Sequence, residues 1–311
     1  MPPALSVIIV SWNTRDLLCQ ALDSVCATGD DDDDALEIIV VDNASSDGTP
    51  TLLQERYPHV KLIDLKENLG FAGGNNRGLA AAQGETILLL NSDTKVLPGA
   101  LSALRQYLED HPKVGLVGPK LLNGDGTTQS SRRRFPTLPL LFLESTWLQP
   151  LAPRRSLERF YMEDVPEATA HPVDWVTGAA MMVRTEVVRQ VGGLDEDYFM
   201  YSEELDWCRR IREAGWEIAY TPAAEIIHYG GRSSDQVVPA RHIYFQTSKV
   251  RYARKFHGRA VAELLRVWLL GQYLWQSALE GAKWLVGHRR ELRAARLNAY
   301  WRVLRSGLRQ P

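Results

Sequence analysis

Short apolar runs alternate with helix-like segments along the first third of the chain, and this alternation constrains the fold more than any other feature. Four runs rich in branched residues are expected to be strands: Leu5–Val10, Glu37–Val41, Val60–Leu65 and Glu85–Leu90. Their largely apolar character is typical of strands that are buried on both faces. Because segments with helical spacing separate them, the sequence predicts parallel β-α-β units and an open, mostly parallel α/β sheet flanked by helices.

Two acids follow predicted strands, Asp42 and Asp93. Ligands of open α/β sheets bind beyond the carboxyl ends of the strands, where both acids are expected. Asp42 can accept a hydrogen bond from a nucleobase N–H or a ribose hydroxyl, and the polar turn after it adds Asn43 and Ser45. The alternative for Asp42 is a purely structural Asx turn.

Asp93 closes the segment Asn91-Ser92-Asp93 directly after an apolar run. A hard divalent cation that bridges two phosphates prefers carboxylate oxygens and needs few other protein ligands. We therefore predict that Asp93 binds a metal, and that Asn91 and Ser92 lie beside the bound diphosphate. The alternative is a helix N-cap, which is a common position for Asp.

The segment Asn68–Gly78 is rich in glycine and is expected to open a helix. Glycine lets backbone approach a ligand, notably at Gly70, and a helix N-terminus attracts anions. Asn68, Asn76 and Arg77 are therefore candidate residues of the diphosphate-binding site. Arg77 is nearly as compatible with an ordinary surface position. The spacing fits neither a dinucleotide-binding fingerprint nor a P-loop.

Glu203 and Glu204 precede a predicted helix, Leu205–Ala214. Adjacent acids raise one another's pKa, which suits a general base near neutral pH. The alternative is an acidic first turn that interacts with the helix dipole, an interpretation that suits Asp206 better. His228 follows a strand-like segment, where it is either a metal or phosphate ligand or a structural histidine.

The middle of the chain is less regular. Asn123–Gly126 predicts a tight hairpin turn. Ser130–Pro153 is expected to be a mobile loop over the site. Trp175–Arg184 is expected to be a strand, and it contains Gly178, a candidate binding-site residue.

Charge is distributed unevenly. Residues 241–311 hold 15 Lys and Arg against 3 acids, a net charge of +12, whereas residues 1–240 carry −14. We therefore predict a catalytic domain over 1–240 and a basic, tryptophan-rich helical extension over 241–311. The acidic catalytic part disfavours nucleic acid. The extension suits an anionic membrane surface, and packing against the catalytic domain or a second subunit explains it equally well.

Membrane insertion and secretion are not expected from this sequence. The longest charge-free apolar piece of the tail, Val267–Leu279, falls short of the ~20 residues that a membrane span needs. The chain opens without a basic segment, and its three cysteines form no paired spacing. These features predict a cytoplasmic protein, peripheral on the inner face of the plasma membrane.

Several segments together resemble the family 2 glycosyltransferases of the GT-A fold, and among them rhamnosyltransferases most closely. These segments, in order along the chain, are Ser6–Asn13, Val40–Gly48, Asn68–Phe71, Leu90–Asp93, Val176–Ala180 and Gly193–Phe199. The resemblance covers roughly residues 5–235. The tail lies outside it.

The resemblance implies an inverting transfer of a sugar, with L-rhamnose a candidate, from a dTDP- or UDP-sugar to a saccharide or lipid-linked acceptor with Mg²⁺ or Mn²⁺. Cell-surface polysaccharide or glycolipid synthesis is the implied setting. It places the nucleotide on Asp42, the metal on Asp93 and His228, and the catalytic pair on Glu203-Glu204, with Glu204 as the base. Two positions depart from the family pattern: Asn91 replaces the first acid of the Asp-x-Asp motif, and Glu204 replaces the usual Asp.

Two alternatives remain at this point. A nucleotidyltransferase also uses metal-binding carboxylates on an α/β sheet, but the chain lacks an evident Gly-rich, Lys-containing triphosphate loop. A non-catalytic nucleotide-sugar or membrane-binding module would not need the acid set. Donor hydrolysis distinguishes this module from an enzyme.

Overall fold

A computed structural model describes residues 3–27, 36–230 and 238–309. The chain forms two compact units. The first unit, here the sheet unit, comprises Met1–Phe135, Glu158–Asp197 and Glu203–Ser233. The second, here the helical unit, comprises Pro136–Leu157, Tyr198–Ser202 and Ser234–Pro311.

The sheet unit alternates strands and helices as expected. Its strands are β1 (Leu5–Ser11), β2 (Leu36–Asp42), β3 (Lys61–Asp64), β4 (Thr86–Asn91), β5 (Thr94–Val96), β6 (Val114–Leu122), β7 (Thr128–Gln129), β8 (Arg132–Arg133), β9 (His171–Val173), β10 (Trp175–Val176), β11 (Ala180–Arg184) and β12 (Glu217–His228). Its helices are α1 (Arg15–Ala27), α2 (Thr49–Arg56), α3 (Gly70–Ala81), α4 (Ala100–Asp110), α7 (Thr185–Val191) and α8 (Glu203–Glu213). A further helix, α6 (Arg154–Phe160), crosses the boundary between the units.

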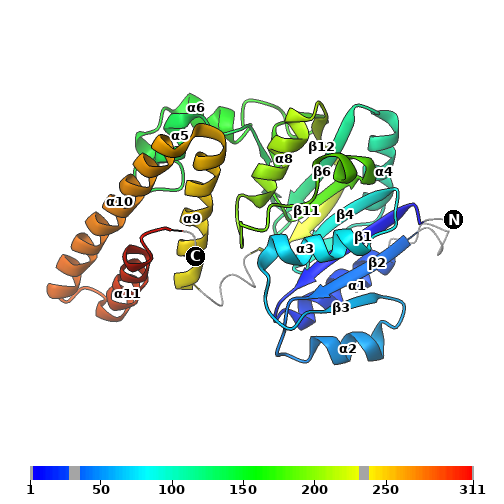
Figure 1. The fold of residues 1–311 in the computed structure, drawn as a ribbon, viewed down its shortest axis with the longest axis horizontal. Helices are drawn as coiled ribbons and strands as arrows, with labels where there is room; N and C mark the ends of the chain where they lie inside the picture. The colour runs from blue at the N-terminus through cyan, green and yellow to red at the C-terminus, as the bar shows by residue number, and fades with distance from the viewer. Residues whose placement is uncertain (1–2, 28–35, 231–237, 310–311) are drawn as a thin grey trace. The chain divides into compact units, whose positions relative to one another are not determined.

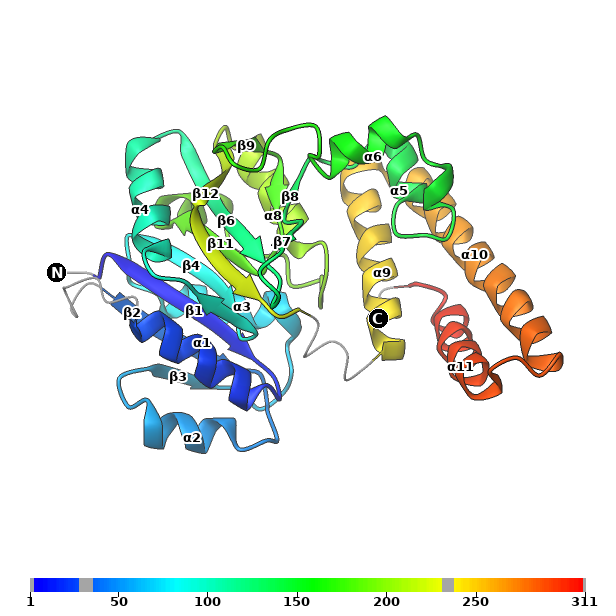
Figure 2. The same ribbon diagram turned by 180° about the vertical axis from the view of Figure 1, so that it is seen from behind.

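The main sheet has the strand order β3-β2-β1-β4-β11-β6-β12-β5 (Figures 1 and 2). The first four strands are mutually parallel, and β12 is parallel to β6. Strand β11 lies antiparallel between β4 and β6. The predicted open α/β sheet is confirmed as a mixed sheet whose main strands are mostly parallel.

Both faces of the sheet are buried, which explains the apolar runs. On one face, α1, α2 and α4 pack against residues such as Val7 and Leu88. On the other face, α3, α7 and α8 pack against residues such as Ile8 and Leu89. Successive residues of one strand therefore belong to two different hydrophobic cores. For this reason the strands are largely apolar and do not alternate between apolar and polar residues.

The order of the strands places the candidate site. Strand β1 pairs with β2 on one side and with β4 on the other. Strands β2 and β3 therefore lie on one side of β1, and the next strand along the chain, β4, lies on the opposite side. Crevices at such reversals bind ligands. The carboxyl ends of β1, β2 and β4 lie at this point. Asp42 is the last residue of β2, and Asp93 follows the end of β4.

Of three local predictions, two need correction. The segment Ser130–Pro153 is not a single loop, because it contains β8, helix α5 (Leu138–Leu143) and the 3₁₀ helix η2 (Gln149–Leu151). Trp175–Arg184 is not one strand, because the chain turns at Gly178 between β10 and β11. The hairpin turn at Asn123–Gly126 is confirmed between β6 and β7.

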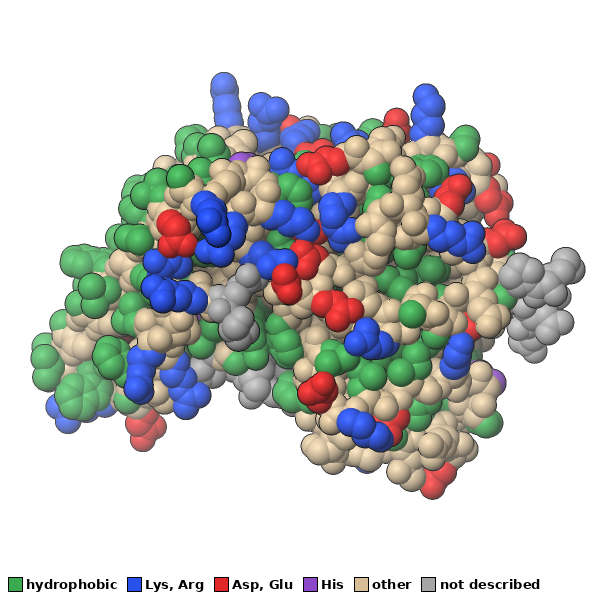
Figure 3. All heavy atoms as spheres, viewed as in Figure 1, with side chains coloured by type: hydrophobic (Ala, Val, Ile, Leu, Met, Phe, Trp, Pro, Cys, Tyr) green, Lys and Arg blue, Asp and Glu red, His purple; other side chains and the backbone are tan. Residues whose placement is uncertain are grey.

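The helical unit is built on α9 (Val238–His257), α10 (Arg259–Leu285) and α11 (Arg290–Ser306), which contact one another. Glu280 of α10 pairs with Arg293 of α11 at 2.6 Å, and both side chains are buried. Across the described residues, no helix combines the length and apolar character needed to cross a bilayer. Figure 3 nevertheless shows hydrophobic side chains gathered over α10.

Candidate active site

Asp93 and His228 are brought together by the pairing of β5 with β12. Asp93 lies in the tight turn between β4 and β5, and Thr94 pairs with His228 in register. Asp93 Oδ1 lies 3.4 Å from His228 Nε2, and the Tyr229 N–H donates to the Asp93 carbonyl at 2.9 Å. The N-cap alternative for Asp93 is wrong, because the next element is a strand.

Gln129 fixes His228 from its other side, and the sequence analysis missed it. His228 Nδ1 lies 2.7 Å from Gln129 Oε1, while Gln129 Nε2 donates to the His228 carbonyl at 3.2 Å. This contact holds the ring so that Nε2 faces Asp93, as outer-shell partners commonly orient a metal-binding histidine. Gln129 lies on β7, in a segment without a distinctive pattern.

The residues at this position suit a divalent cation. Asn91 Nδ2 lies 3.4 Å from His228 Nε2, so an amide, an imidazole and the Asp93 carboxylate converge. No group of three or more His, Cys, Asp or Glu with metal-binding geometry occurs within the described ranges. A cation that keeps waters and takes further oxygens from a substrate diphosphate needs only one or two protein carboxylates, so the donor set fits Mg²⁺ or Mn²⁺.

Ser92 ties the end of β4 to the end of β1. Its hydroxyl lies 2.8 Å from Thr14 Oγ1, which lies 3.0 Å from Ser11 Oγ. All three side chains are buried. The hydroxyl chain holds the two sides of the crevice together next to Asp93.

Asp42 is fully buried at the end of β2. Its Oδ2 accepts the Ser45 N–H at 2.9 Å, as the Asx-turn alternative requires. Its Oδ1 has no hydrogen-bond partner within the described residues, and burial raises the pKa of the carboxyl. A buried acceptor without a partner is costly, so Asp42 also fits the binding of a ligand N–H or hydroxyl.

Asn43 and Asn68 hold the loop that opens α3. Asn43 Nδ2 donates to Asn68 Oδ1 at 2.9 Å and to the Gly70 carbonyl at 3.0 Å, and Asn43 Oδ1 accepts the Leu69 N–H at 2.8 Å. Gly70 has φ +73°, in the left-handed region that favours glycine. Contacts within the protein therefore occupy the Asn43 amide and the Asn68 Oδ1 atom, and they shape this loop.

The glycines inside α3 serve packing. A Cβ on Gly74 would lie 2.7 Å from Val10 Cγ1, so the helix approaches β1 more closely than any larger residue permits. The interpretation of these glycines as a close approach to a ligand therefore has a packing alternative at Gly74. Gly70 is not affected by this contact.

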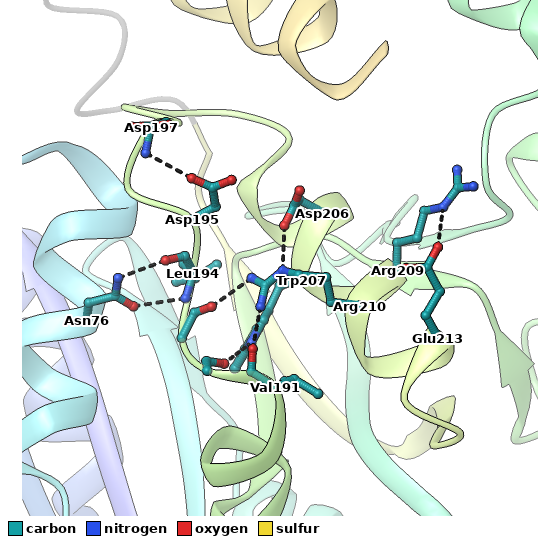
Figure 4. Close-up of polar contacts among 12 residues, drawn as sticks. Asn76, Val191, Leu194, Asp195, Asp197, Asp206, Trp207, Arg209, Arg210 and Glu213 are labelled. Carbon is teal, nitrogen blue, oxygen red and sulfur yellow. Dashed lines mark hydrogen bonds and ion pairs between the residues drawn. The ribbon is translucent and has the colours of Figure 1, made fainter. Parts of the chain in front are cut away.

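Asn76 and Arg77 both face the segment that leads to the acid pair (Figure 4 for Asn76). Asn76 Nδ2 donates to the Leu194 carbonyl at 2.8 Å, and Asn76 Oδ1 accepts the Leu194 N–H at 2.9 Å. Arg77 lies 3.4 Å from Glu196 in an exposed ion pair. These contacts give both residues a structural role in holding residues 193–196 against α3.

Glu203 and Glu204 begin helix α8 instead of preceding it. Glu203 is 4% exposed, and burial together with the neighbouring Glu204 raises its pKa well above the ordinary value. Gly178 lies beside Glu204, because a Cβ on Gly178 would be 3.7 Å from Glu204 Cβ and 3.5 Å from the Phe71 ring. The small residue leaves room next to the Glu204 side chain.

Asp93 and Glu204 belong to the same end of the sheet. The Asn91 N–H donates to the Ala179 carbonyl at 2.9 Å, which joins the end of β4 to the turn that carries Gly178. Gly178 in turn lies beside Glu204. Asp93, the candidate metal ligand, and Glu204, the candidate base, are therefore connected through the end of β4 and the turn that carries Gly178.

Helix α8 is fixed by a buried ion pair (Figure 4). Arg210 Nε donates to Asp206 Oδ1 at 2.7 Å, and its two terminal nitrogens donate to the carbonyls of Val191 and Gly193. Trp207 Nε1 donates to the Gly192 carbonyl at 2.9 Å. Asp206, whose side chain is fully buried, thus holds the helix through Arg210.

We expect Arg210→Leu to lower the free energy of unfolding by about 3–5 kcal/mol, because it leaves the Asp206 charge buried without its cation. Arg209→Leu is the matched control, since Arg209 pairs with Glu213, which is 58% exposed against 0% for Asp206. The control should lose less than about 1 kcal/mol. Urea unfolding followed by circular dichroism measures both, and equal losses would contradict the burial argument.

The comparisons with known proteins identify the family of this chain. The model of "Glycosyl transferase family 2" matches residues 6–192, and the chain belongs to that family. It is 33% identical to an N-acetylglucosaminyl-diphospho-decaprenol L-rhamnosyltransferase of Mycobacterium tuberculosis, over 67% of this chain and 71% of the relative. It is 29% identical to the rhamnosyltransferase WbbL of Escherichia coli, over 80% of this chain and 92% of that protein.

The fold is also found among solved structures. The mannosyltransferase PcManGT of Pyrobaculum calidifontis, solved with GDP-Man and Mn²⁺, aligns with a TM-score of 0.56 at 19% identity and covers 99% of this chain and 85% of its own. The protein is therefore a glycosyltransferase of the GT-A fold with rhamnosyltransferase homologues. The nucleotidyltransferase alternative is not favoured.

Proposed function

We propose that this enzyme transfers a sugar, L-rhamnose in the first instance, from a nucleotide-diphosphate donor to an acceptor hydroxyl with inversion. The proposal is supported by the contact between Asp93 and His228 at the end of β4 in a family 2 sheet, and by the position of Glu204 beside Gly178 in the turn that is hydrogen-bonded to Asn91. In this mechanism the Glu204 carboxylate accepts the proton of the acceptor hydroxyl. The acceptor oxygen forms a bond to the anomeric carbon as the bond to the diphosphate breaks on the opposite face.

Glu203 supports the base without acting as one. Burial and the adjacent acid raise the pKa of Glu203, which favours its neutral form. A neutral Glu203 would place no like charge beside Glu204. Gly178 keeps the space beside Glu204 open for the acceptor.

The donor is held by residues at the ends of β2 and β4. Asp42 accepts a hydrogen bond from the nucleobase or ribose through Oδ1, its buried oxygen without a partner within the described residues. Asp93 and His228, with Asn91 beside them, would hold Mg²⁺ or Mn²⁺. When bound, the cation neutralises negative charge that develops on the leaving diphosphate.

A thermal-shift screen of dTDP- and UDP-sugars, with and without Mn²⁺, tests donor class. We expect one donor to raise Tm only when Mn²⁺ is present. A ligand at a hundredfold excess over Kd stabilises the folded protein by about 2.7 kcal/mol. The same donor should release nucleoside diphosphate slowly in the absence of acceptor. If no dTDP- or UDP-sugar produced a shift, the proposed donor class would be wrong.

We further propose that the outward side of α10 attaches the enzyme to an anionic membrane, where a lipid-linked acceptor would lie. Exposed apolar side chains recur there at helical spacing: Leu264, Val267, Trp268, Leu274 and Trp275 are each at least 37% exposed. The +12 charge of residues 241–311 supports attraction to anionic headgroups. The inner face of the plasma membrane is the site that this proposal implies.

Liposome flotation tests the membrane proposal. We expect the double variant Leu274→Glu/Trp275→Glu to lower the partition onto anionic vesicles at least about tenfold, because it removes two apolar contacts and adds like charge. Leu151→Glu is the control, since Leu151 is 73% exposed but lies on η2. If the double variant left flotation unchanged and instead converted a dimer to a monomer, α10 would be a self-association surface.

A further inference from the structure

The helical unit contains a cavity of about 470 Å³ whose lining includes none of the candidate active-site residues. Its walls come from α9, α10, α11 and the residues after α5, all within one unit. The volume lies within the ~300–1,000 Å³ typical of small-molecule sites. The lining residues indicate which chemistry it suits.

Two buried amides line the cavity and retain hydrogen-bonding capacity. Gln246 on α9 is 5% exposed and Gln272 on α10 is 8% exposed. In the part of the chain that the structure describes, Gln246 Oε1 and Gln272 Nε2 have no hydrogen-bond partner. Because buried amide groups are normally paired, the residues of the wall hold one acceptor and one donor that lack a partner among the described residues.

Aromatic rings provide the complementary apolar surface. The Tyr273 and Tyr300 rings lie 5.5 Å apart at 65°, and the His242 ring lies 6.1 Å from Tyr273 and 6.3 Å from Tyr300. The Tyr273 hydroxyl accepts from Gln246 Nε2 at 3.4 Å and lies 3.2 Å from His242 Nδ1. Polar groups and ring faces therefore alternate around one small volume.

The wall is almost uncharged. Burial raises the pKa of Tyr273 to about 12 and, together with Arg241, lowers the pKa of His242, so both are neutral near pH 7. Arg241 is exposed and is the one lining residue with a permanent charge among those described. A wall of this kind selects neither an anion nor a cation.

We infer that this cavity is a binding site for a neutral saccharide of one or two rings, separate from the donor site of the sheet unit. A pyranose has C–H faces that stack on Tyr273 and Tyr300, and hydroxyls that both donate and accept, as Gln246 and Gln272 require. An apolar chain would leave both amides desolvated without partners. A phosphate group would find only Arg241.

Saturation-transfer NMR tests this inference without any donor. N-acetylglucosamine, L-rhamnose and cellobiose serve as probes, with octanol as the apolar comparison. We expect signal from at least one sugar and an affinity about tenfold lower in Gln246→Leu and in Gln272→Leu, the loss expected for one hydrogen bond. Gln54→Leu on the exposed face of α2 makes the same chemical change elsewhere and should bind normally.

Two further variants keep the test decisive. Gln276→Trp places a large ring at a half-buried lining position and should abolish the signal even if a buried Gln variant does not fold. Glu204→Gln should keep the signal, which separates this site from the transfer reaction. Absence of signal from every sugar, signal that survives both Gln246→Leu and Gln276→Trp, or binding of octanol alone would overturn the inference.

Discussion

Glu204→Gln should lower kcat about a hundred- to ten-thousand-fold and leave the donor Kd nearly unchanged. The amide keeps the size of the side chain but cannot accept the acceptor proton, and general bases contribute about this factor. Steady-state transfer assays and calorimetric titration of the donor measure the two quantities. Glu213→Gln, an exposed acid at the other end of α8, should behave as wild type.

Glu203→Gln distinguishes the two members of the pair. Since burial and the adjacent acid raise the pKa of the Glu203 carboxyl and so favour its neutral form, an amide of equal size resembles it. We expect turnover within a few-fold of wild type at neutral pH. If Glu203→Gln lost activity while Glu204→Gln retained it, the base would be Glu203.

The strand-end acids were predictable because the information that places them is local. An apolar run followed by Asp42 or Asp93 gives both the strand and the end at which the acid lies, and parallel neighbours bring such ends together. The helix that starts at Gly70 was predictable from glycine and alanine composition. The GT-A fold and the family followed from these segments in order.

Contacts between distant segments were not predictable from local sequence. Gln129 reaches His228 only because β7 pairs with β6, which pairs with β12. Asn76 and Arg77 have the chemistry of phosphate ligands, yet their partners are Leu194 and Glu196, more than a hundred positions away. Residue type indicates which bonds a side chain can form, and the tertiary fold decides with which partner.

The residues before the acid pair show the same limit. Tyr198–Ser202 packs in the helical unit, where Ser248 Oγ donates to the Met200 carbonyl at 2.8 Å and Phe199 stacks on Tyr244 at 4.5 Å. Tyr201 and Ser202 have φ of +70° and +64°, which non-glycine residues adopt only under tertiary constraint. No periodicity marks this segment, although it leads directly into the acid pair.

Asp93→Ala should weaken Mn²⁺-dependent donor binding at least about a hundredfold. Loss of outer-shell partners of a metal already lowers affinity about 10- to 100-fold, and Asp93 is the carboxylate of the proposed donor set. The variant should fold normally, because the contact between Tyr229 and Asp93 uses the backbone carbonyl. Calorimetric titration of the donor, with Mn²⁺ and with EDTA, measures the effect without requiring turnover.

The pattern across variants separates a metal ligand from a general loss of structure. Asp110→Ala removes an exposed acid from the end of α4 and should leave the titration unchanged. Gln129→Ala should weaken Mn²⁺-dependent binding less than Asp93→Ala, because it frees the His228 ring without removing a ligand. Asp93→Ala binding that equals wild type in Mn²⁺ would exclude Asp93 from the metal site, whereas equal losses in Mn²⁺ and in EDTA would assign it a direct role in donor binding instead.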